Sequence, residues 1–174
     1  MVMNRTRRWT RRGIKSALGI VTATAALGIV VAAAPAQAAP QACSGQVNVN
    51  VCLAIEPYGN AGHDGLFRVH IGIDFRITQQ DAQAVIDTQR DPYFAEVLGD
   101  DGAAKSELFP VPETSITASA TGGLSATFDT IVFSSQLRED DHGEDELQAR
   151  VIFTDPRGIL TTRVFDSPDF VGNF

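Results

Sequence analysis

Acidic residues are missing from the start of this 174-residue chain, and basic residues are scarce in the rest of it. Residues 1–38 contain six Arg or Lys and no Asp or Glu, whereas residues 39–174 contain eight basic and 21 acidic residues, a net charge of −13. Eight dispersed cations cannot supply the counterion release that drives nucleic-acid binding, and the same charge disfavours anionic membrane surfaces. We therefore expect no nucleic-acid partner, whereas cationic partners and divalent cations stay open.

Motifs that carry catalytic chemistry are also missing. The chain contains no Gly-x-Ser-x-Gly elbow and no Ser-x-x-Lys pair. Its three histidines, His63, His70 and His142, have no metal-ligand spacing among them. The single tryptophan, Trp9, lies in the basic head, so the rest of the chain lacks the residue on which sugar-binding platforms rely most. We therefore predict no catalytic and no cofactor-binding residue from motifs.

The basic head is followed by an apolar run that indicates export. Residues 17–34 carry no charge, and Ala36-Gln37-Ala38 places small residues where a signal peptidase cleaves. We predict a signal peptide at residues 1–38 and a single domain at residues 39–174. An uncleaved anchor is the alternative, although the run is barely long enough to span a bilayer and is diluted by Ala, Gly and Thr. After cleavage no stable membrane insertion is expected.

The export route has two interpretations. The pair Arg11-Arg12, followed two places later by Ile14, resembles a twin-arginine export signal. Any arginine-rich head forms such pairs by chance, so Sec export is the alternative. Either route predicts a bacterial protein that acts outside the cytoplasm, secreted or extracytoplasmic.

Cysteine is limited to two residues, Cys43 and Cys52. In an exported chain, the oxidising compartment favours a disulfide between them. The bond would close a loop of about ten residues and contribute about 2.5–3 kcal/mol in the chain-entropy model. Lipidation of Cys43 is disfavoured by Pro40 three places upstream. A metal site is weaker still, because two cysteines without a nearby histidine supply only half of the ligands.

Strict alternation of apolar and polar residues dominates the rest of the chain. Residues 67–77 are apolar at every odd position, which predicts a long strand with one buried and one solvated face. Similar patterns predict further strands at residues 47–53, 93–98, 115–120, 124–133, 147–153 and 159–165, and an edge strand at residues 108–111 beside Pro110.

Three local features complete the predicted fold. The apolar row of residues 124–133 changes phase, so we expect a β-bulge near Asp129 and Thr130. Thr78 starts a capping box, which predicts a short helix from Gln79 to about Thr88. A strong turn at residues 155–158 predicts a hairpin. Together these patterns indicate an all-β fold, an antiparallel β-sandwich of the immunoglobulin-like class with one short helix.

The most polar segment is an acidic loop at residues 139–146, with six carboxylates in eight residues. Such a density of hard oxygen ligands suits calcium, with Asp140, Asp141, Glu144 and Asp145 as candidate ligands. The alternative is a solvated loop whose charges keep a sheet edge from pairing with other chains. A second acidic turn at residues 99–102 would support the calcium site if both acidic loops lie at the same end of the sandwich; its alternative interpretation is an ordinary turn. Calcium is the only cofactor that the sequence suggests.

The solvated face of the long strand offers the other candidate site. Arg68, His70, Asp74 and Arg76 alternate along it, either as a binding patch or as ordinary cross-strand pairs. The preferred function is non-catalytic surface recognition, or a structural role, with an extracellular or cell-envelope protein as partner. One alternative is a small secreted hydrolase whose carboxylates and histidine converge in three dimensions. Another is an inhibitor of extracellular proteases that uses an extended loop at residues 110–114.

Overall fold

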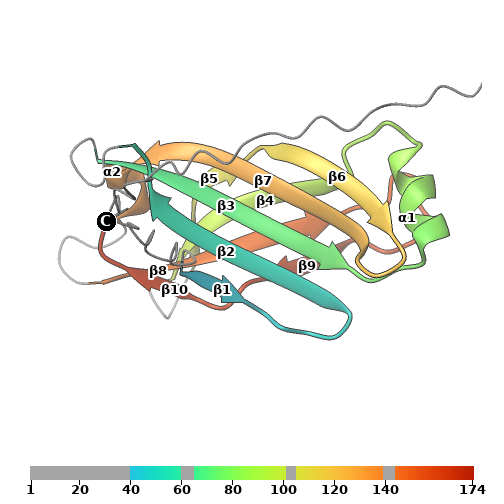
Figure 1. Ribbon diagram of the computed structural model, residues 1–174, viewed down its shortest axis with the longest axis horizontal. Helices are drawn as coiled ribbons and strands as arrows, with labels where there is room; N and C mark the ends of the chain where they lie inside the picture. The colour runs from blue at the N-terminus through green and yellow to red at the C-terminus, as the bar shows by residue number, and fades with distance from the viewer. Residues whose placement is uncertain (1–39, 60–64, 101–104, 139–143) are drawn as a thin grey trace, which may run out of the picture. The chain divides into compact units, whose positions relative to one another are not determined.

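Two antiparallel sheets pack face to face in the computed structural model, which describes residues 40–59, 65–100, 105–138 and 144–174 (Figure 1). The first sheet contains β1 (Gln41–Cys43), β2 (Val49–Pro57), β3 (Leu66–Phe75), β6 (Glu113–Ser119) and β7 (Gly123–Phe133). The second contains β4 (Tyr93–Asp100), β5 (Lys105–Val111), β8 (Asp145–Phe153), β9 (Arg163–Asp166) and β10 (Phe170–Gly172). The predicted leader at residues 1–38 lies outside the described residues.

The order of the strands confirms an antiparallel sandwich. The first sheet runs β1-β2-β3-β7-β6, and the second runs β10-β8-β4-β5 with β9 also paired to β8. As predicted, β5 is an edge strand, and the weak strand β6 is an edge strand as well. The chain therefore visits the first sheet, then the second, then returns to each once more.

The dry interior follows from the predicted alternation. On β3 the side chains of Val69, Ile71 and Ile73 face the second sheet and are almost completely buried. Phe153 on β8 lies opposite them, with its ring centroid 5.2 Å from that of Phe75. The matching inward rows of the other strands are Val51, Leu53 and Ile55 on β2, Leu124, Ala126 and Phe128 on β7, and Leu147, Ala149 and Val151 on β8.

The prediction of a β-bulge near Asp129 and Thr130 is wrong. β7 pairs with β3 without a break from Leu124 to Phe133, so its even-numbered side chains all face inward. Thr130 simply occupies one inward position, while Ile131 and Phe133 point outward and are 46% and 60% exposed. The ten consecutive residue pairs with β3 determine which side chains of β7 face the core, even though this register exposes two apolar residues. A bulge does occur against β7, but it lies in the neighbouring strand β6 between Glu113 and Ser115.

The short helix α1 (Gln79–Ile86) starts where the capping box predicts. The Thr78 hydroxyl accepts a hydrogen bond from the backbone N–H of Asp81 at 3.1 Å. Ala82 and Val85 are buried against β6 and β7, at the end of the sandwich where Figure 1 shows the helix. A one-turn helix that the sequence did not predict, α2 (Ser134–Leu137), follows β7 and buries Leu137.

The predicted hairpin near the C-terminus is confirmed, but its second strand, predicted from residue 159, begins only at Arg163. β9 pairs with β8 from Arg150 opposite Asp166 to Phe153 opposite Arg163. The backbone N–H of Gly158 donates to the carbonyl of Asp155 at 2.9 Å and closes the predicted turn. The tail then continues along the same edge of β8 as β10, and Phe170 is buried there.

The predicted disulfide joins Cys43 to Cys52, which are directly opposite each other on β1 and β2. It lies on the outer side of the first sheet, because its neighbours Val51 and Leu53 point inward. A disulfide at this position is typical of an oxidising compartment outside the cytoplasm. Within the described residues, no helix has the length and apolar character that crossing a bilayer requires.

Candidate functional site

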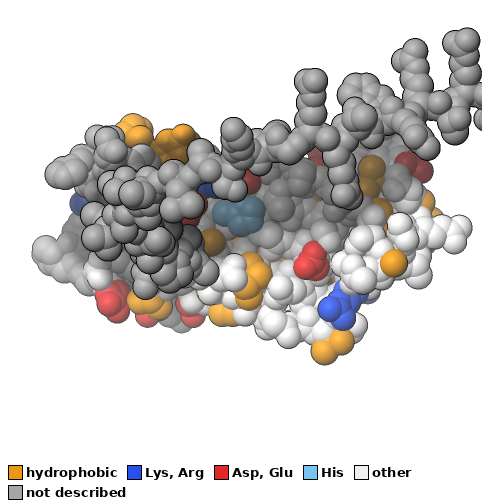
Figure 2. Space-filling model, viewed as in Figure 1, with side chains coloured by type: hydrophobic (Ala, Val, Ile, Leu, Met, Phe, Trp, Pro, Cys, Tyr) orange, Lys and Arg blue, Asp and Glu red, His pale blue; other side chains and the backbone are white. Residues whose placement is uncertain are grey.

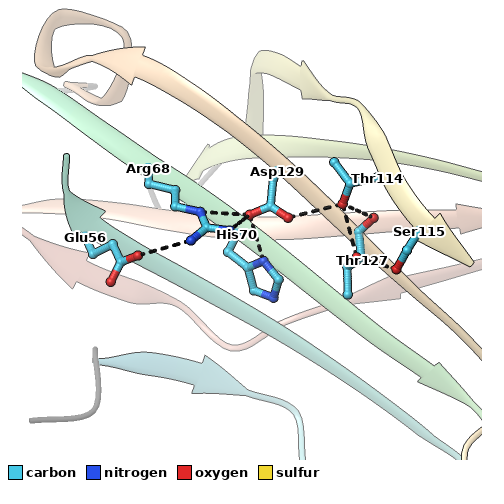
Figure 3. Close-up of polar contacts among 7 residues, drawn as sticks. All are labelled: Glu56, Arg68, His70, Thr114, Ser115, Thr127 and Asp129. Atoms are coloured by element: carbon cyan, nitrogen blue, oxygen red, sulfur yellow. Dashed lines mark hydrogen bonds and ion pairs between the residues drawn. The ribbon is translucent and has the colours of Figure 1, made fainter. Parts of the chain in front are cut away.

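The outer face of the first sheet places charged side chains of three strands side by side. Alternation on β3 turns Arg68 and His70 away from the core. The register of β3 then sets His70 opposite Asp129 on β7 and Arg68 opposite Glu56 on β2. Figure 3 shows Arg68 and His70 pointing to the carboxylate of Asp129, with Glu56 on the other side of the Arg68 guanidinium. We call this group the Asp129 network.

Asp129 is the acceptor at the centre of this network. Its Oδ1 accepts hydrogen bonds from Arg68 Nε at 3.0 Å and Nη2 at 2.7 Å, and lies 3.0 Å from His70 Nδ1. Thr114 on β6 donates its hydroxyl proton to Oδ2 at 3.1 Å. Partial burial acts to raise the pKa of Asp129, but the hydrogen bonds from His70, Arg68 and Thr114 outweigh it and hold that pKa below its usual value.

The ionised carboxylate also determines which nitrogen of His70 carries the proton. A carboxylate only accepts hydrogen bonds, so Nδ1 of His70 is protonated, and Nε2 is the acceptor in the neutral ring. Gly72, two residues further along the same face, has no side chain to cover the ring, and Nε2 lies 3.9 Å from where its Cβ would be. Among the described residues His70 bonds only through Nδ1.

Hydroxyl groups extend the network towards the edge of the sheet. The Thr114 hydroxyl lies 3.1 Å from that of Thr127 on β7, which in turn lies 2.8 Å from the hydroxyl of Ser115. The line of polar groups in Figure 3 therefore runs from Glu56 on β2 to Ser115 on β6. It spans four strands of the first sheet.

Two hollows flank Arg68 on this face. One of about 240 Å³ is lined by Ala54, Glu56, Arg68 and His70. It exists because the small side chain of Ala54 lies opposite His70 in the register. The other, of about 290 Å³, is lined by Tyr58, Arg68, Asp129, Thr130 and Ile131. Figure 2 shows a histidine side chain at the surface on this face of the molecule.

Tyr58 and Ile131 line the second hollow, and Phe133 lies two residues beyond Ile131 on the same side of β7. Tyr58, Ile131 and Phe133 are 47%, 46% and 60% exposed, and all three belong to the outer side of the first sheet. The sequence assigned Ile131 and Phe133 to the core, and their exposure is the consequence of the unbroken register described above. The site therefore combines one ordered arginine with three exposed apolar side chains.

The interpretation of the exposed row on β3 as cross-strand pairs is confirmed for three of its members, including His70, which lies 3.0 Å from Asp129 as described above. Arg68 bonds to Asp129 and lies 3.8 Å from Glu56. Asp74 accepts a hydrogen bond from Ser125 on β7 at 2.6 Å. The sequence missed Asp129, Glu56 and Thr114, because nothing local indicates which residues of distant strands face Arg68 and His70.

The calcium candidates fall only partly within the described residues. Asp140 and Asp141 lie outside them, as do His63 and His142. Glu144 is exposed, whereas Asp145 begins β8 and is buried. The described residues contain no group of three or more His, Cys, Asp or Glu side chains that could hold a metal ion.

The two acidic segments do adjoin described strands at the same end of the second sheet. Gly99, near the end of β4, pairs with Leu147, near the start of β8. The calcium site stays a prediction, because Asp101 and residues 139–143 lie outside the described part of the chain.

Comparisons with known proteins add no assignment. No protein-family model, no curated protein and no solved structure matches this chain. The function therefore rests on the geometry of the site.

Proposed function

We propose that this protein is exported through a signal peptide at residues 1–38 and acts outside the cytoplasm as a non-catalytic recognition domain that binds a protein partner. The disulfide between Cys43 and Cys52 supports the location, because such bonds persist in oxidising compartments. An immunoglobulin-like arrangement of the strands is part of the same proposal.

The observation that carries the proposal is the composition of the face around Arg68. Tyr58, Arg68 and Ile131 line one hollow, and Phe133 is exposed nearby. Interfaces between proteins are enriched in aromatic residues and arginine, and a few such residues supply most of the binding energy. We call Tyr58, Arg68, Ile131 and Phe133 the recognition face.

The Asp129 network prepares this face for binding. Asp129 accepts hydrogen bonds from both Nε and Nη2 of Arg68, so the guanidinium is held in one orientation before a partner binds. Ordering a long side chain on binding costs about 0.5–1.5 kcal/mol, and a side chain that is already held avoids much of that cost. The network therefore acts as a positioning device for Arg68.

Substitutions of two residues of the recognition face, Tyr58 and Ile131, test the proposal. In the double variant Tyr58→Asp with Ile131→Asp, we expect at least one protein from the medium of the producing cells to be captured about tenfold less than by the wild type, since interface anchors each contribute more than about 1 kcal/mol. Captured proteins are quantified by mass spectrometry on immobilised protein. Thermal unfolding of each variant verifies that the fold is retained.

Val164→Asp is the matched control, because Val164 is 55% exposed on the second sheet. This variant should capture the same proteins as the wild type. Identical capture by wild type and double variant, or no protein captured above an empty support, would contradict the proposal.

A hydrolase is the second candidate, supported by the pairing of His70 with Asp129. The carboxylate orients the ring, and Glu56 lines the same hollow, so a water molecule could be activated by Nε2. In this case His70→Ala should slow hydrolysis of an ester or phosphodiester by about 100-fold or more. Val164→Asp again serves as the control. Equal rates for His70→Ala and wild type across a substrate panel would exclude the candidate.

The inhibitor interpretation receives less support from the placement of residues 110–114. Val111 is 3% exposed at the end of β5, where the segment crosses from one sheet to the other, although Pro110, Pro112 and Thr114 are exposed. Proteases bind a continuous exposed segment of an inhibitor, and the buried side chain of Val111 opposes this mode of binding.

A further inference from the structure

A separate cavity lies where the chain crosses from β5 to β6. It has a volume of about 250 Å³, and its walls include Asp91, Tyr93, Phe94, Pro112, Glu113 and Phe128. Tyr93 and Phe128 form a buried floor, whereas Asp91, Phe94 and Pro112 are exposed at the rim. At about 30 Å³ for each water molecule, the volume equals roughly eight waters, which is room for one long side chain.

The β-bulge of β6 directs Glu113 towards this cavity. Glu113 pairs with Phe128 and Ser115 pairs with Thr127, so Thr114 is the extra residue. Thr114 and Ser115 are consequently both exposed, and Figure 3 shows their side chains turned to the outer face. Glu113 is left on the inward side, opposite a side chain that is 1% exposed. Bulges often re-aim one side chain in this manner next to functional sites.

The carboxylate of Glu113 is incompletely satisfied. Its Oε2 is fully buried and accepts no hydrogen bond from any residue that the structure describes. Burial and the nearby charge of Asp91 raise the pKa of Glu113. A buried oxygen of this kind costs free energy unless a donor reaches it.

Among the described residues that line the cavity, the charged ones are both acidic, Asp91 and Glu113. Besides burial, the charge of Asp91 raises the pKa of Glu113, and the charges of Glu113 and Asp74 raise the pKa of the Tyr93 hydroxyl. That hydroxyl already donates its proton to the carbonyl of Leu124 at 3.1 Å, so it is not free to serve Glu113. Aromatic rings beside carboxylates form a setting that attracts organic cations, because the ring faces and the carboxylates are both negative.

We propose that this cavity binds an organic ammonium or guanidinium group, with Glu113 as its ion-pair partner, Asp91 at the rim, and Tyr93, Phe94 and Phe128 around the aliphatic stem. The site is distinct from the recognition face and does not depend on it. The cation is either a Lys or Arg side chain of a polypeptide or a free small amine. Both sources share the same chemistry and are distinguished by the experiment.

The test is an NMR titration of the purified protein. The probes are cadaverine, Nα-acetyl-lysine methylamide and a five-residue alanine peptide with a central lysine. Each should cause saturable shifts of the amide signals of Thr114, Ser115 and Phe128. A stronger response to the peptide identifies a polypeptide side chain as the cation, and a stronger response to cadaverine identifies a free amine.

Two controls separate this site from general attraction to an acidic protein. Nα-acetyl-norleucine methylamide, which has no charge, should cause no saturable shift. Glu113→Gln should weaken binding of the cationic probes about tenfold or more, because it removes the charge and keeps the shape. Glu107→Gln removes an exposed acid on the adjacent strand β5 and should leave the binding unchanged.

Three results would overturn the proposal. They are linear shifts that do not saturate, equal binding to wild type and Glu113→Gln, and equal binding of the norleucine and lysine derivatives. Unchanged amide signals outside the cavity confirm that Glu113→Gln folds normally. That variant should be at least as stable as the wild type, since it removes a buried charge.

Discussion

Replacing Gly123 by Ala is expected to lower the free energy of unfolding by about 4 kcal/mol, because the new methyl group would collide with main-chain atoms. Gly123 has a φ of +73°, and a Cβ there would lie 2.3 Å from the carbonyl oxygen of Phe75 and 2.7 Å from the nitrogen of Ile77. These atoms belong to the backbone that leads from β3 into α1. They cannot rotate away as the end of a flexible side chain would.

Gly158→Ala is the matched control for this prediction. Gly158 has a φ of +72°, but nothing lies within 4 Å of its Cβ position. Its replacement should cost only the conformational strain, about 1 kcal/mol. Urea unfolding followed by circular dichroism measures both variants. Equal losses for the two variants would show that the end of β3 does not approach Gly123 as closely as described.

The second large effect is expected at Asp155, whose side chain is completely buried beside the turn after β8. It accepts hydrogen bonds from the backbone N–H groups of Arg157 and Leu160, at 2.9 and 3.0 Å. Arg157 adds Nε and Nη2 at 3.0 and 3.1 Å. Asp155→Asn removes the charge and turns one acceptor into a donor, which should cost about 3 kcal/mol at neutral pH.

The effect of Asp155→Asn should also depend on pH. The side-chain bonds from Arg157 outweigh the effect of burial and, with the backbone bonds, lower the pKa of Asp155 from its usual 3.8 to about 2. A carboxyl whose pKa is lower in the folded state stabilises that state above pH 4, and the contribution disappears as the pH falls towards 2. The difference corresponds to about 2 kcal/mol. The gap between wild type and variant should therefore narrow from neutral pH to pH 2.

Urea unfolding at a series of pH values checks this expectation. Asp87→Asn is the control, because Asp87 is exposed and accepts one bond from Gln83 on the same helix face. It should differ from the wild type by less than about 0.5 kcal/mol at neutral pH. A gap between Asp155→Asn and wild type that stays constant down to pH 2 would contradict the assigned role of the carboxylate.

Most strands were predictable because their signal is periodic and short-ranged. On β3 the alternation identified both the buried side chains and the solvated Arg68 and His70. The predicted burial was wrong at Ile131 and Phe133, where the alternation was ambiguous. There the pairing with β3 determined which side of β7 faces the core, and no local pattern contained that information.

The sequence predicted only some of the residues of the candidate site. Arg68 and His70 could be assigned to an exposed face, but their partner Asp129 is 61 residues away from Arg68 in the chain. Its position opposite His70 depends on the alignment of two strands to within one residue. A shift by one residue would have turned Asp129 inward and left Arg68 and His70 without this partner.

Contacts between near neighbours are therefore predictable from the amino-acid order: the Thr78 cap, the turn at Asp155, the disulfide and the alternation of each strand. Each depends on residues within about ten positions, where the backbone geometry leaves few choices. The grouping of Arg68 with Asp129, and the inward turn of Glu113 at its bulge, depend on register between strands. A shift of two residues keeps the same apolar side chains facing the core, so packing of the whole sandwich was needed to select the register.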